Sequence, residues 1–231
     1  MPLRNKLRRV DDVRVLVTAG PTREAIDPVR FISNRSSGKM GYAIAEAAAQ
    51  AGHRVRLISG PVAMNAPQDV KRVSVTTAEE MLCAVRQYVG QCDMLVMVAA
   101  VADWRPKKIA KQKLKKSDGP PCIEWEATPD ILKTIAPMKK PSQVFCGFAA
   151  ETNRVNQEAQ RKLRDKNLDV LAANDVSKKG RGFESECNLL NLYFADGHVV
   201  RGTLTTKKKC AEELMRELEK IAAQKKKCKK K

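Results

Sequence analysis

The nine residues 33–41, "SNRSSGKMG", have the composition of an anion-binding loop. Ser36 and Ser37 supply hydroxyl groups, and Gly38 and Lys39 follow them immediately before an apolar stretch with helical spacing. The free N–H groups and positive dipole end of a helix favour a bound phosphate at such a position. Alternatively, a serine simply caps the helix and Lys39 is an ordinary first-turn residue. The pattern leaves both interpretations open.

Two further groups of lysines could hold the charge of a polyphosphate. The run 111–116, "KQKLKK", lies on a proline-interrupted basic segment that follows an apolar strand run. A mobile flap that closes over a triphosphate would explain this position, and a solvated charged surface is the alternative. Lys162 and Lys166 lie four apart beside the apolar stripe of a predicted helix, so they could reach the same anion or only water.

Polar residues also stand where two apolar runs end. Asp103 ends one run, and Asn174 and Asp175 end another. Each could be a simple strand cap, but two such ends could also converge on one crevice. His53 and His198 are the only histidines, and both lie in predicted turns. Histidine-based acid–base chemistry and a Ser-His-Asp triad are therefore not expected.

Composition limits the class of protein. The 231 residues carry a net charge of +18, much of it near the two ends. The seven cysteines are scattered without a C-x-x-C pair, which argues against a structural zinc site or a disulfide framework and favours the reducing cytoplasm. No run approaches the roughly 18 to 20 apolar residues of a membrane span, so no membrane partner is expected.

Short apolar runs alternate with helical patterns, which indicates a parallel sheet covered on both faces. The predicted strands are 13–20, 54–60, 69–75, 94–103, 143–151 and 168–176. The predicted helices are 36–52, 78–89, 153–167 and 210–224, and the second has a capping box of Thr77 and Glu80. We therefore expect a doubly wound, mainly parallel, Rossmann-like α/β sheet, with ligands outside the carboxyl ends of its strands.

Two segments depart from this alternation. Residues 104–127 are read as a basic flap, and residues 188–202 as a C-terminal β-hairpin with an Asp196-Gly197 turn before the terminal helix. The expected organisation is a basic tail at 1–12, one domain at 13–222 and a disordered lysine-rich tail at 223–231.

Two other classes of function fit these features less well. A nucleic-acid-binding α/β protein would interleave lysines with exposed aromatic residues, but aromatics make up only 4% of the chain. An NAD(P)-dependent reductase would need a G-x-G-x-x-G fingerprint after the first strand, where this chain has "TAGPTRE". Neither is favoured, and no nucleic-acid partner is expected.

Several segments, in this order, resemble the phosphopantothenoylcysteine synthetase family over roughly residues 13–220. They are "VLVTAGPTREAIDPVRFISNRSSGKMGYAIAEAA", "SGPV", "AAVADWRP", "KQKLKK", "ATPDIL", "GFAAET", "RKLRDKNLDVLAANDV" and "GFESECN". In many bacteria this domain is the C-terminal half of a bifunctional flavoprotein, so the chain could be free-standing or excised. Trp104 and "ATPD" are mild departures from the family pattern.

The resemblance implies a ligase of coenzyme A biosynthesis that joins 4'-phosphopantothenate to L-cysteine. An acyl-cytidylate would form from CTP with loss of pyrophosphate, and cysteine would then displace CMP. The sequence looks like the bacterial CTP-dependent type, with ATP as the alternative nucleotide. Magnesium and a homodimer are also implied, with residues 33–41 near the partner subunit.

The resemblance also implies site residues. Asn34 would handle the acyl-cytidylate, because a neutral amide can bind it without repelling phosphates, and Lys113 would neutralise the triphosphate. Backbone amides near 97–99 would read the base edge. The phosphopantothenate residues would be Asn34, Ser36, Ser37 and Gly38. The CTP residues would be Met97, Val98, Ala99, Asp103, Lys113, Pro129, Asp130, Ile131, Leu132, Phe148, Lys162 and Lys166.

Overall fold

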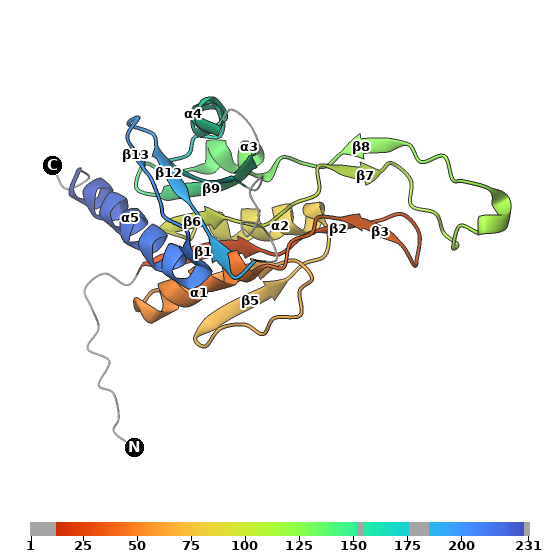
Figure 1. The fold of residues 1–231 in the computed structure, drawn as a ribbon, viewed down its shortest axis with the longest axis horizontal. Helices are drawn as coiled ribbons and strands as arrows, with labels where there is room; N and C mark the ends of the chain where they lie inside the picture. The colour runs from red at the N-terminus through yellow and green to blue at the C-terminus, as the bar shows by residue number, and fades with distance from the viewer. Residues whose placement is uncertain (1–12, 152–154, 176–184, 229–231) are drawn as a thin grey trace, which may run out of the picture.

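The computed structural model describes residues 13–151, 155–175 and 185–228, which form one large sheet with helices on both faces (Figure 1). The strand order is β13-β12-β10-β9-β6-β1-β4-β5. The strands are β1 (Arg14–Ala19), β4 (Arg54–Ser59), β5 (Val70–Ser74), β6 (Met94–Met97), β9 (Val144–Glu151), β10 (Val170–Asp175), β12 (Asn191–Phe194) and β13 (Val199–Val200). The helices are α1 (Lys39–Gln50), α2 (Ala78–Val89), α3 (Ile131–Ile135), α4 (Val155–Asp165) and α5 (Lys207–Cys228).

The strands from β10 to β5 run parallel, and β12 and β13 add antiparallel pairs at one edge. The chain moves outward from β1 to β4 and β5, and then crosses back to β6 on the other side of β1. This order is that of doubly wound dinucleotide-binding sheets, so the predicted fold class is confirmed. The reversal leaves a switch point between the carboxyl ends of β1 and β6, where such sheets bind ligands.

Near-continuous apolar sequence forms the central strands because both of their faces are covered. Val15, Leu16 and Val17 of β1 are each at most 2% exposed. The predicted strand 94–103 is too long, since β6 ends at Met97. The residues that follow leave the ladder to form the loop at the switch point.

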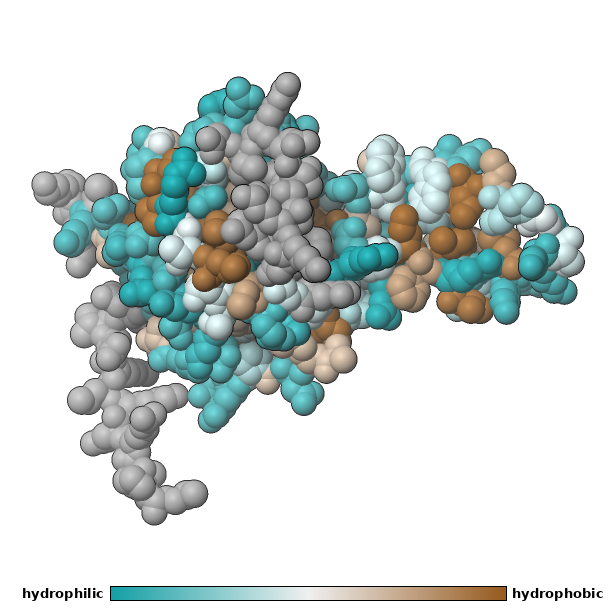
Figure 2. Space-filling model, viewed as in Figure 1, coloured by the Kyte–Doolittle hydropathy of each residue, from teal (hydrophilic) through white to brown (hydrophobic). Residues whose placement is uncertain are grey.

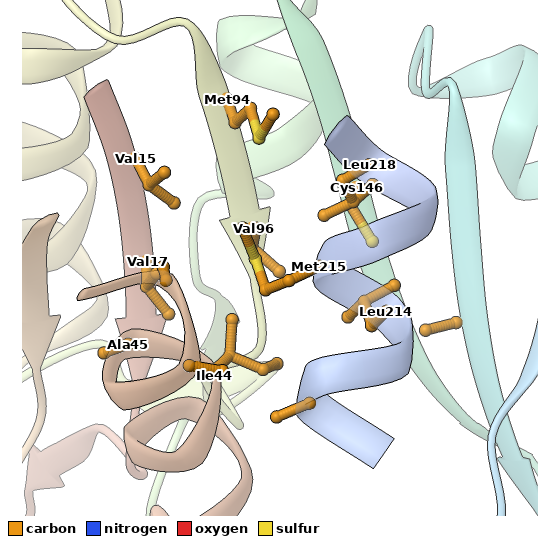
Figure 3. Packing of buried hydrophobic residues seen from close by; sticks show 14 of the residues in the cluster. Val15, Val17, Ile44, Ala45, Met94, Val96, Cys146, Leu214, Met215 and Leu218 are labelled. Atoms are coloured by element: carbon orange, nitrogen blue, oxygen red, sulfur yellow. The ribbon is translucent and has the colours of Figure 1, made fainter. Parts of the chain in front are cut away.

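Helices α1 and α5 lie side by side on one face of the sheet, and α2, α3 and α4 cover the other. Figure 3 shows how side chains of α1 and α5 meet alternate residues of β1, β6 and β9. The residues in this layer include Val15, Val17, Ile44, Ala45, Met94, Val96, Cys146, Leu214, Met215 and Leu218. Alternation along each strand sends the intervening residues to the opposite layer.

The predicted capping box begins α2. The Thr77 hydroxyl accepts a hydrogen bond from the Glu80 N–H at 3.1 Å, and the Glu80 carboxylate accepts one from the Thr76 N–H at 2.6 Å. The Thr77 hydroxyl therefore satisfies one amide of the first turn, whereas the Glu80 carboxylate bonds to the residue before the N-cap and not to Thr77 itself.

The C-terminal part of the chain forms the predicted hairpin, but its helix is longer than predicted. β12 and β13 form the predicted hairpin, with Gly197 at φ +94° in its turn. The terminal helix α5 continues to Cys228, so the expected disordered tail does not begin at 223. Lys225 explains part of the difference, because its ammonium group bonds to Asp169 at the amino end of β10. Residues 229–231 and the expected N-terminal tail lie outside the described residues.

Two hairpins project from the sheet along the long axis of the molecule (Figure 1). β2 (Arg23–Ala25) pairs with β3 (Phe31–Ser33), and β7 (Trp104–Pro106) pairs with β8 (Trp125–Ala127). We call residues 23–33 and 104–127 together the arm. Figure 2 shows apolar side chains exposed among polar ones along it. The large exposed hydrophobic residues of the arm are Val29, Phe31, Trp104, Ile109 and Trp125.

The remaining elements are short. β11 (Cys187–Asn188) pairs with β14 (Thr205–Thr206) just before α5 begins. Two 3-10 turns cover Lys116–Asp118 on the arm and Ala136–Met138 after α3.

Candidate functional site

The loops that follow β1 and β6 are bonded together at the switch point. The Ala100 N–H donates to the Gly20 carbonyl at 2.9 Å, and the Thr22 N–H donates to the Ala100 carbonyl at 3.4 Å. Pro21 and Ala100 form an isolated parallel bridge. This pairing extends the contact between β1 and β6 beyond their ends. We call the edge of the sheet at the carboxyl ends of its parallel strands the rim.

Two buried threonines fix the loop after β6, and sequence reasoning missed both. The Thr18 hydroxyl accepts hydrogen bonds from the N–H groups of Val98 (3.1 Å) and Ala99 (3.2 Å). The Thr22 hydroxyl accepts one from the Ala102 N–H at 3.0 Å. The N–H groups of Val98 and Ala99 were expected to read a base edge, but both already donate to Thr18. These two residues can therefore offer a base only their carbonyl oxygens or side chains.

Asn34 lies against the same loop. Its side-chain Nδ2 donates to the carbonyl oxygens of Ala100 at 3.1 Å and Val101 at 3.0 Å. The reverse amide orientation would place Oδ1 against two carbonyl oxygens, so the contacts determine which atom is nitrogen. With Nδ2 bound to the loop, the group that Asn34 can offer to a substrate is the acceptor Oδ1.

The helix after Asn34 begins at Lys39, three residues later than predicted. Gly38 is the N-cap residue and makes no side-chain capping bond, so the interpretation of a serine N-cap is wrong. The Ser36 hydroxyl instead accepts from the Gly38 N–H at 3.4 Å, within the loop. Because the N-cap residue of α1 supplies no side-chain cap, the start of this helix is a suitable position for an anion.

Close backbone packing determines where this helix starts. Gly38 has φ +79°, a conformation that glycine adopts without steric cost, and it packs against Gly20. A Cβ atom on Gly41 would lie 2.5 Å from the Ala19 Cβ atom. The first turn of α1 can therefore approach the end of β1 only because both positions lack a side chain.

Lys39 and Lys207 bring two ammonium groups to the starts of α1 and α5. Lys39 forms an ion pair with Glu186, which lowers the pKa of that carboxyl. Lys207 is only 6% exposed, and its N–H donates to the Glu186 carbonyl at 3.0 Å. Burial and then the nearby Lys39 lower the pKa of Lys207, while Glu186 opposes that change. The two helix starts thus form a positively charged part of the rim.

A second predicted group assembles around α3. The Asp130 carboxylate caps this helix by accepting from the Lys133 N–H at 3.0 Å, and it forms an ion pair with Lys166 at 3.0 Å. Partial burial opposes ionisation of Asp130, but the Lys133 N–H and the Lys166 ammonium together keep its pKa below the usual value. Lys162 lies on α4, four residues before Lys166, which follows the end of that helix, and Lys162 is half-buried.

Thr128 joins this second group to the β6 loop. Its N–H donates to the Asp103 carbonyl at 2.9 Å, and its hydroxyl donates to the Ala102 carbonyl at 2.5 Å. Residues 129–132 are therefore held next to the switch point. The Asp103 residue is exposed at the same rim.

The remaining predicted CTP residues differ in what they can offer. Met97 and Ile131 are buried in the core, so they would contact a ligand through the main chain. Phe148 is half-buried and packs on the side of the sheet that α1 and α5 cover. Asn174 is 9% exposed at the end of β10, and its Oδ1 has no hydrogen-bond partner among the residues that the structure describes. The side chain of Asp175 lies outside the described part of the chain.

Lys113 is not brought to the rim. It is exposed on the arm, which projects away from the strand ends (Figure 1). The neighbouring residue Leu114 is bonded to Asp27 in the other hairpin of the arm. To reach a nucleotide at the rim, Lys113 must move with the arm or come from a second copy of the chain.

Within residues 13–151, 155–175 and 185–228, no group of three His, Cys, Asp or Glu side chains could hold a metal ion. None of the helices described in these ranges is long and apolar enough to cross a membrane.

Residues 10–222 match the family described as "DNA/pantothenate metabolism flavoprotein C-terminal domain". The chain is 50% identical over 190 residues to the coenzyme A biosynthesis bifunctional protein CoaBC of Vibrio vulnificus, which covers 81% of this chain and 47% of that protein. It is 44% identical to the Bacillus subtilis protein of the same name over 211 residues, covering 91% of this chain and 52% of that one. The chain thus spans about half the length of these relatives.

Solved structures show the same fold. A crystal structure of the C-terminal domain of CoaBC superposes with a TM-score of 0.79 at 45% identity, covering 92% of this chain and 96% of that chain. A Cab2 variant in complex with phosphopantothenate-cysteine superposes with a TM-score of 0.76, covering 95% and 89% of the two chains. The identity to Cab2 is 15%, so this second likeness concerns the fold alone.

Proposed function

Because the chain belongs to the DNA/pantothenate metabolism flavoprotein C-terminal domain family, we propose that it is the ligase that joins 4'-phosphopantothenate to L-cysteine in coenzyme A biosynthesis. The observation that carries this proposal is the rim at the switch point. There, the oriented amide of Asn34, the glycine-capped start of α1 and the loop after β6 lie together. This arrangement suits an acyl substrate beside a polyphosphate.

In the first proposed step, a carboxylate oxygen of 4'-phosphopantothenate attacks the α-phosphorus of CTP. The bond to the bridging oxygen breaks, and pyrophosphate leaves with the electron pair. The N–H groups at the start of α1 and the ammonium groups of Lys113, Lys162 and Lys166 would stabilise the charge on the phosphates. Asp130 would keep Lys166 in place through their ion pair.

In the second proposed step, the amine nitrogen of cysteine attacks the acyl carbon of the acyl-cytidylate. The bond between that carbon and the phosphate oxygen breaks, CMP leaves, and the nitrogen loses a proton. Asn34 Oδ1 is an acceptor of fixed orientation that could bind the attacking amine while it still carries its hydrogens. An acidic side chain at this position would add a negative charge beside the phosphates.

Magnesium would arrive with the nucleotide. Phosphate oxygens and water would hold most of its coordination positions. Asp103, which is exposed at the rim, is the residue that we expect to add a protein ligand.

The proposal is tested by measuring pyrophosphate and CMP release with each substrate omitted in turn, and with CTP or ATP side by side. We expect sustained release only when 4'-phosphopantothenate, cysteine and CTP are all present, and a product with the mass of the ligated amide. Turnover that prefers ATP would leave the ligation intact and correct the nucleotide. Release that does not depend on cysteine or phosphopantothenate would contradict the proposal.

Lys113→Gln is expected to lower kcat/KM for CTP by about a hundredfold, because a cation that faces the transferring phosphates is lost. The melting temperature should not change, since Lys113 is exposed and supports no core contact. Lys111→Gln is the matched control, because it removes the same charge from an exposed position of the same arm. Equal rates for the two variants would refute the role of Lys113.

We also propose a homodimer in which the arm contacts the second subunit. Exposed Phe31, Trp104 and Trp125 on a projecting arm are typical of an interface, where aromatic side chains are enriched. Light scattering should report two chains per particle. If the arm serves the partner's site, mixing Lys113→Gln with Asn34→Ala subunits will restore activity, because each mixed dimer then holds one intact site.

The arm carries the features by which the alternative function, nucleic-acid binding, can be tested. Trp104 and Trp125 are exposed beside lysines on this segment, which is the pattern that alternative requires. We expect no binding of single-stranded DNA or RNA at physiological salt, and fluorescence of the two tryptophans would detect it. Tight binding there would favour the alternative.

A further inference from the structure

A buried carboxylate in the arm has no part in the chemistry proposed above. Asp27 lies in the turn between β2 and β3, and its side chain is fully buried. Its Oδ1 accepts hydrogen bonds from the N–H groups of Val29 at 2.8 Å and Arg30 at 2.7 Å. Its Oδ2 accepts from the Arg30 side chain at 2.9 and 2.5 Å and from the Leu114 N–H at 3.1 Å.

These bonds join the two hairpins of the arm. The Leu114 carbonyl accepts a hydrogen bond from Arg30 Nη2 at 2.6 Å, so both main-chain groups of Leu114 are held by the turn. The Ala110 N–H donates to the Ile26 carbonyl at 3.0 Å. Residues 26–30 therefore fasten residues 110–114, which lie more than 80 positions later in the chain. We call this set of contacts the Asp27 clamp.

The Asp27 carboxylate stays ionised over the working pH range. The Arg30 side chain, and then the N–H donors of Val29, Arg30 and Leu114, hold the pKa of Asp27 far below its usual value. A carboxylate that is buried and accepts several donors cannot be replaced by an amide without loss, because an amide has one acceptor oxygen. Asparagine at this position would direct N–H groups toward Arg30 and Leu114, which are donors.

The same hairpin leads to the rim. β3 ends at Ser33, whose hydroxyl donates to the Thr22 carbonyl at 2.7 Å, and Asn34 follows directly. One hairpin thus holds the main chain next to Lys113 at its turn and presents Asn34 at its end. Both residues belong to the proposed machinery, yet they lie on different segments of the sequence.

We infer that Asp27 is a positioning residue that holds the backbone around Lys113 and couples it to the Asn34 loop. This inference rests on the proposed function of Lys113. A long lysine side chain on a free loop must lose backbone and side-chain freedom when it binds a phosphate. The clamp restricts the backbone in advance, so that the lysine extends from a defined position on the arm.

The test is a double-mutant cycle of Asp27→Asn and Lys113→Gln, with kcat and KM measured against CTP. Asp27→Asn should lower kcat/KM by roughly tenfold to a hundredfold in the wild-type background. It should have an effect of less than about twofold in the Lys113→Gln background, because residues that act as a unit are non-additive. Hydrogen exchange of the Ala110 and Leu114 amides should become faster in Asp27→Asn.

Asp118→Asn is the matched control, since it removes an exposed carboxylate from the same arm outside the clamp. It should leave both kinetics and exchange unchanged. If Asp27→Asn does not fold, Arg30→Lys enters the same cycle, because a single ammonium cannot bridge Asp27 and the Leu114 carbonyl as the guanidinium does.

Two outcomes would overturn the inference and can be told apart. If Lys113→Gln lowers the rate but Asp27→Asn does not, or if their effects multiply fully, the clamp has no positioning role and the proposed function stands. If Lys113→Gln has wild-type kinetics, the assignment of Lys113 fails and the inference fails with it.

Discussion

Asn34→Ala should lower kcat/KM for ligation by about 10² to 10³, the usual effect of removing one oriented polar group from a reaction centre. The reason is geometric, since Nδ2 is held by the carbonyls of Ala100 and Val101 and Oδ1 is thereby aimed in one direction. Because Asn34 is exposed, the melting temperature should change little.

Asn34→Asp should be more harmful than Asn34→Ala. In the wild-type protein, Asn34 Nδ2 lies 3.1 Å from the Ala100 carbonyl oxygen and 3.0 Å from that of Val101. A carboxylate oxygen in place of Nδ2 would repel both carbonyl oxygens and push the loop after β6 away. Mass spectrometry after mixing Asn34→Ala with CTP and phosphopantothenate should detect accumulated acyl-cytidylate, because the second step is slowed more than the first.

Asn65→Asp provides the control for Asn34→Asp, since it makes the same chemical change at an exposed loop position. It should behave as the wild-type protein does. Normal product formation by Asn34→Asp, with no trapped intermediate in either Asn34 variant, would contradict the role assigned to Asn34.

Asp169→Asn should have the largest effect on stability, about 3 kcal/mol, because it leaves buried cations without their counter-charge. Asp169 Oδ1 accepts from Lys225 at 2.5 Å, and Oδ2 lies 2.9 Å from Lys139 Nζ. The Oδ2 atom also accepts from the Phe145 N–H at 2.8 Å. A loss of this size corresponds to a fall in melting temperature of roughly 6 to 12 °C for a chain of this length.

The effect of Asp169→Asn should depend on pH. Burial lowers the pKa of Lys139 from its usual 10.5, and Asp169 opposes that change. Without Asp169 the folded pKa falls further, so the folded variant holds fewer protons than the unfolded chain over a wider pH range. Stability therefore rises with pH through that range, and the deficit of the variant should shrink as pH approaches 10.5.

Urea unfolding at several pH values measures this deficit. Asp165→Asn is the control, because its exposed ion pair with Arg161 should contribute less than about 1 kcal/mol. A change of the same size in both variants, or a deficit independent of pH, would show that the Lys139–Asp169–Lys225 contact does not hold α5 to the sheet.

Much of the fold could be predicted from local patterns. Near-continuous apolar runs identified the parallel strands, since strands buried on both faces need them. The spacing of Thr77 and Glu80 predicted the start of α2, and the Asp196-Gly197 pair predicted the β12–β13 turn. These features depend on neighbours in the sequence, and the chain therefore determined them by itself.

Other features were decided by tertiary structure alone. α1 begins at Lys39 because Gly38 packs on Gly20 and Gly41 on Ala19, which local spacing does not show. Residues 223–228 are helical where Lys225 meets Asp169. In each case the partner is distant in sequence, and strand order decides which segments meet.

The candidate site shows the same division. Its residue types were visible in "SNRSSGKMG" and in the lysines, but the atoms they use were not. Asn34 is oriented by carbonyls 66 and 67 positions away, and Leu114 is held by Asp27 from 87 positions away. The sequence alone thus determined the layers and the chemical groups, whereas the order of strands around the switch point decided which groups face one another, because only that order brings the ends of β1 and β6 together.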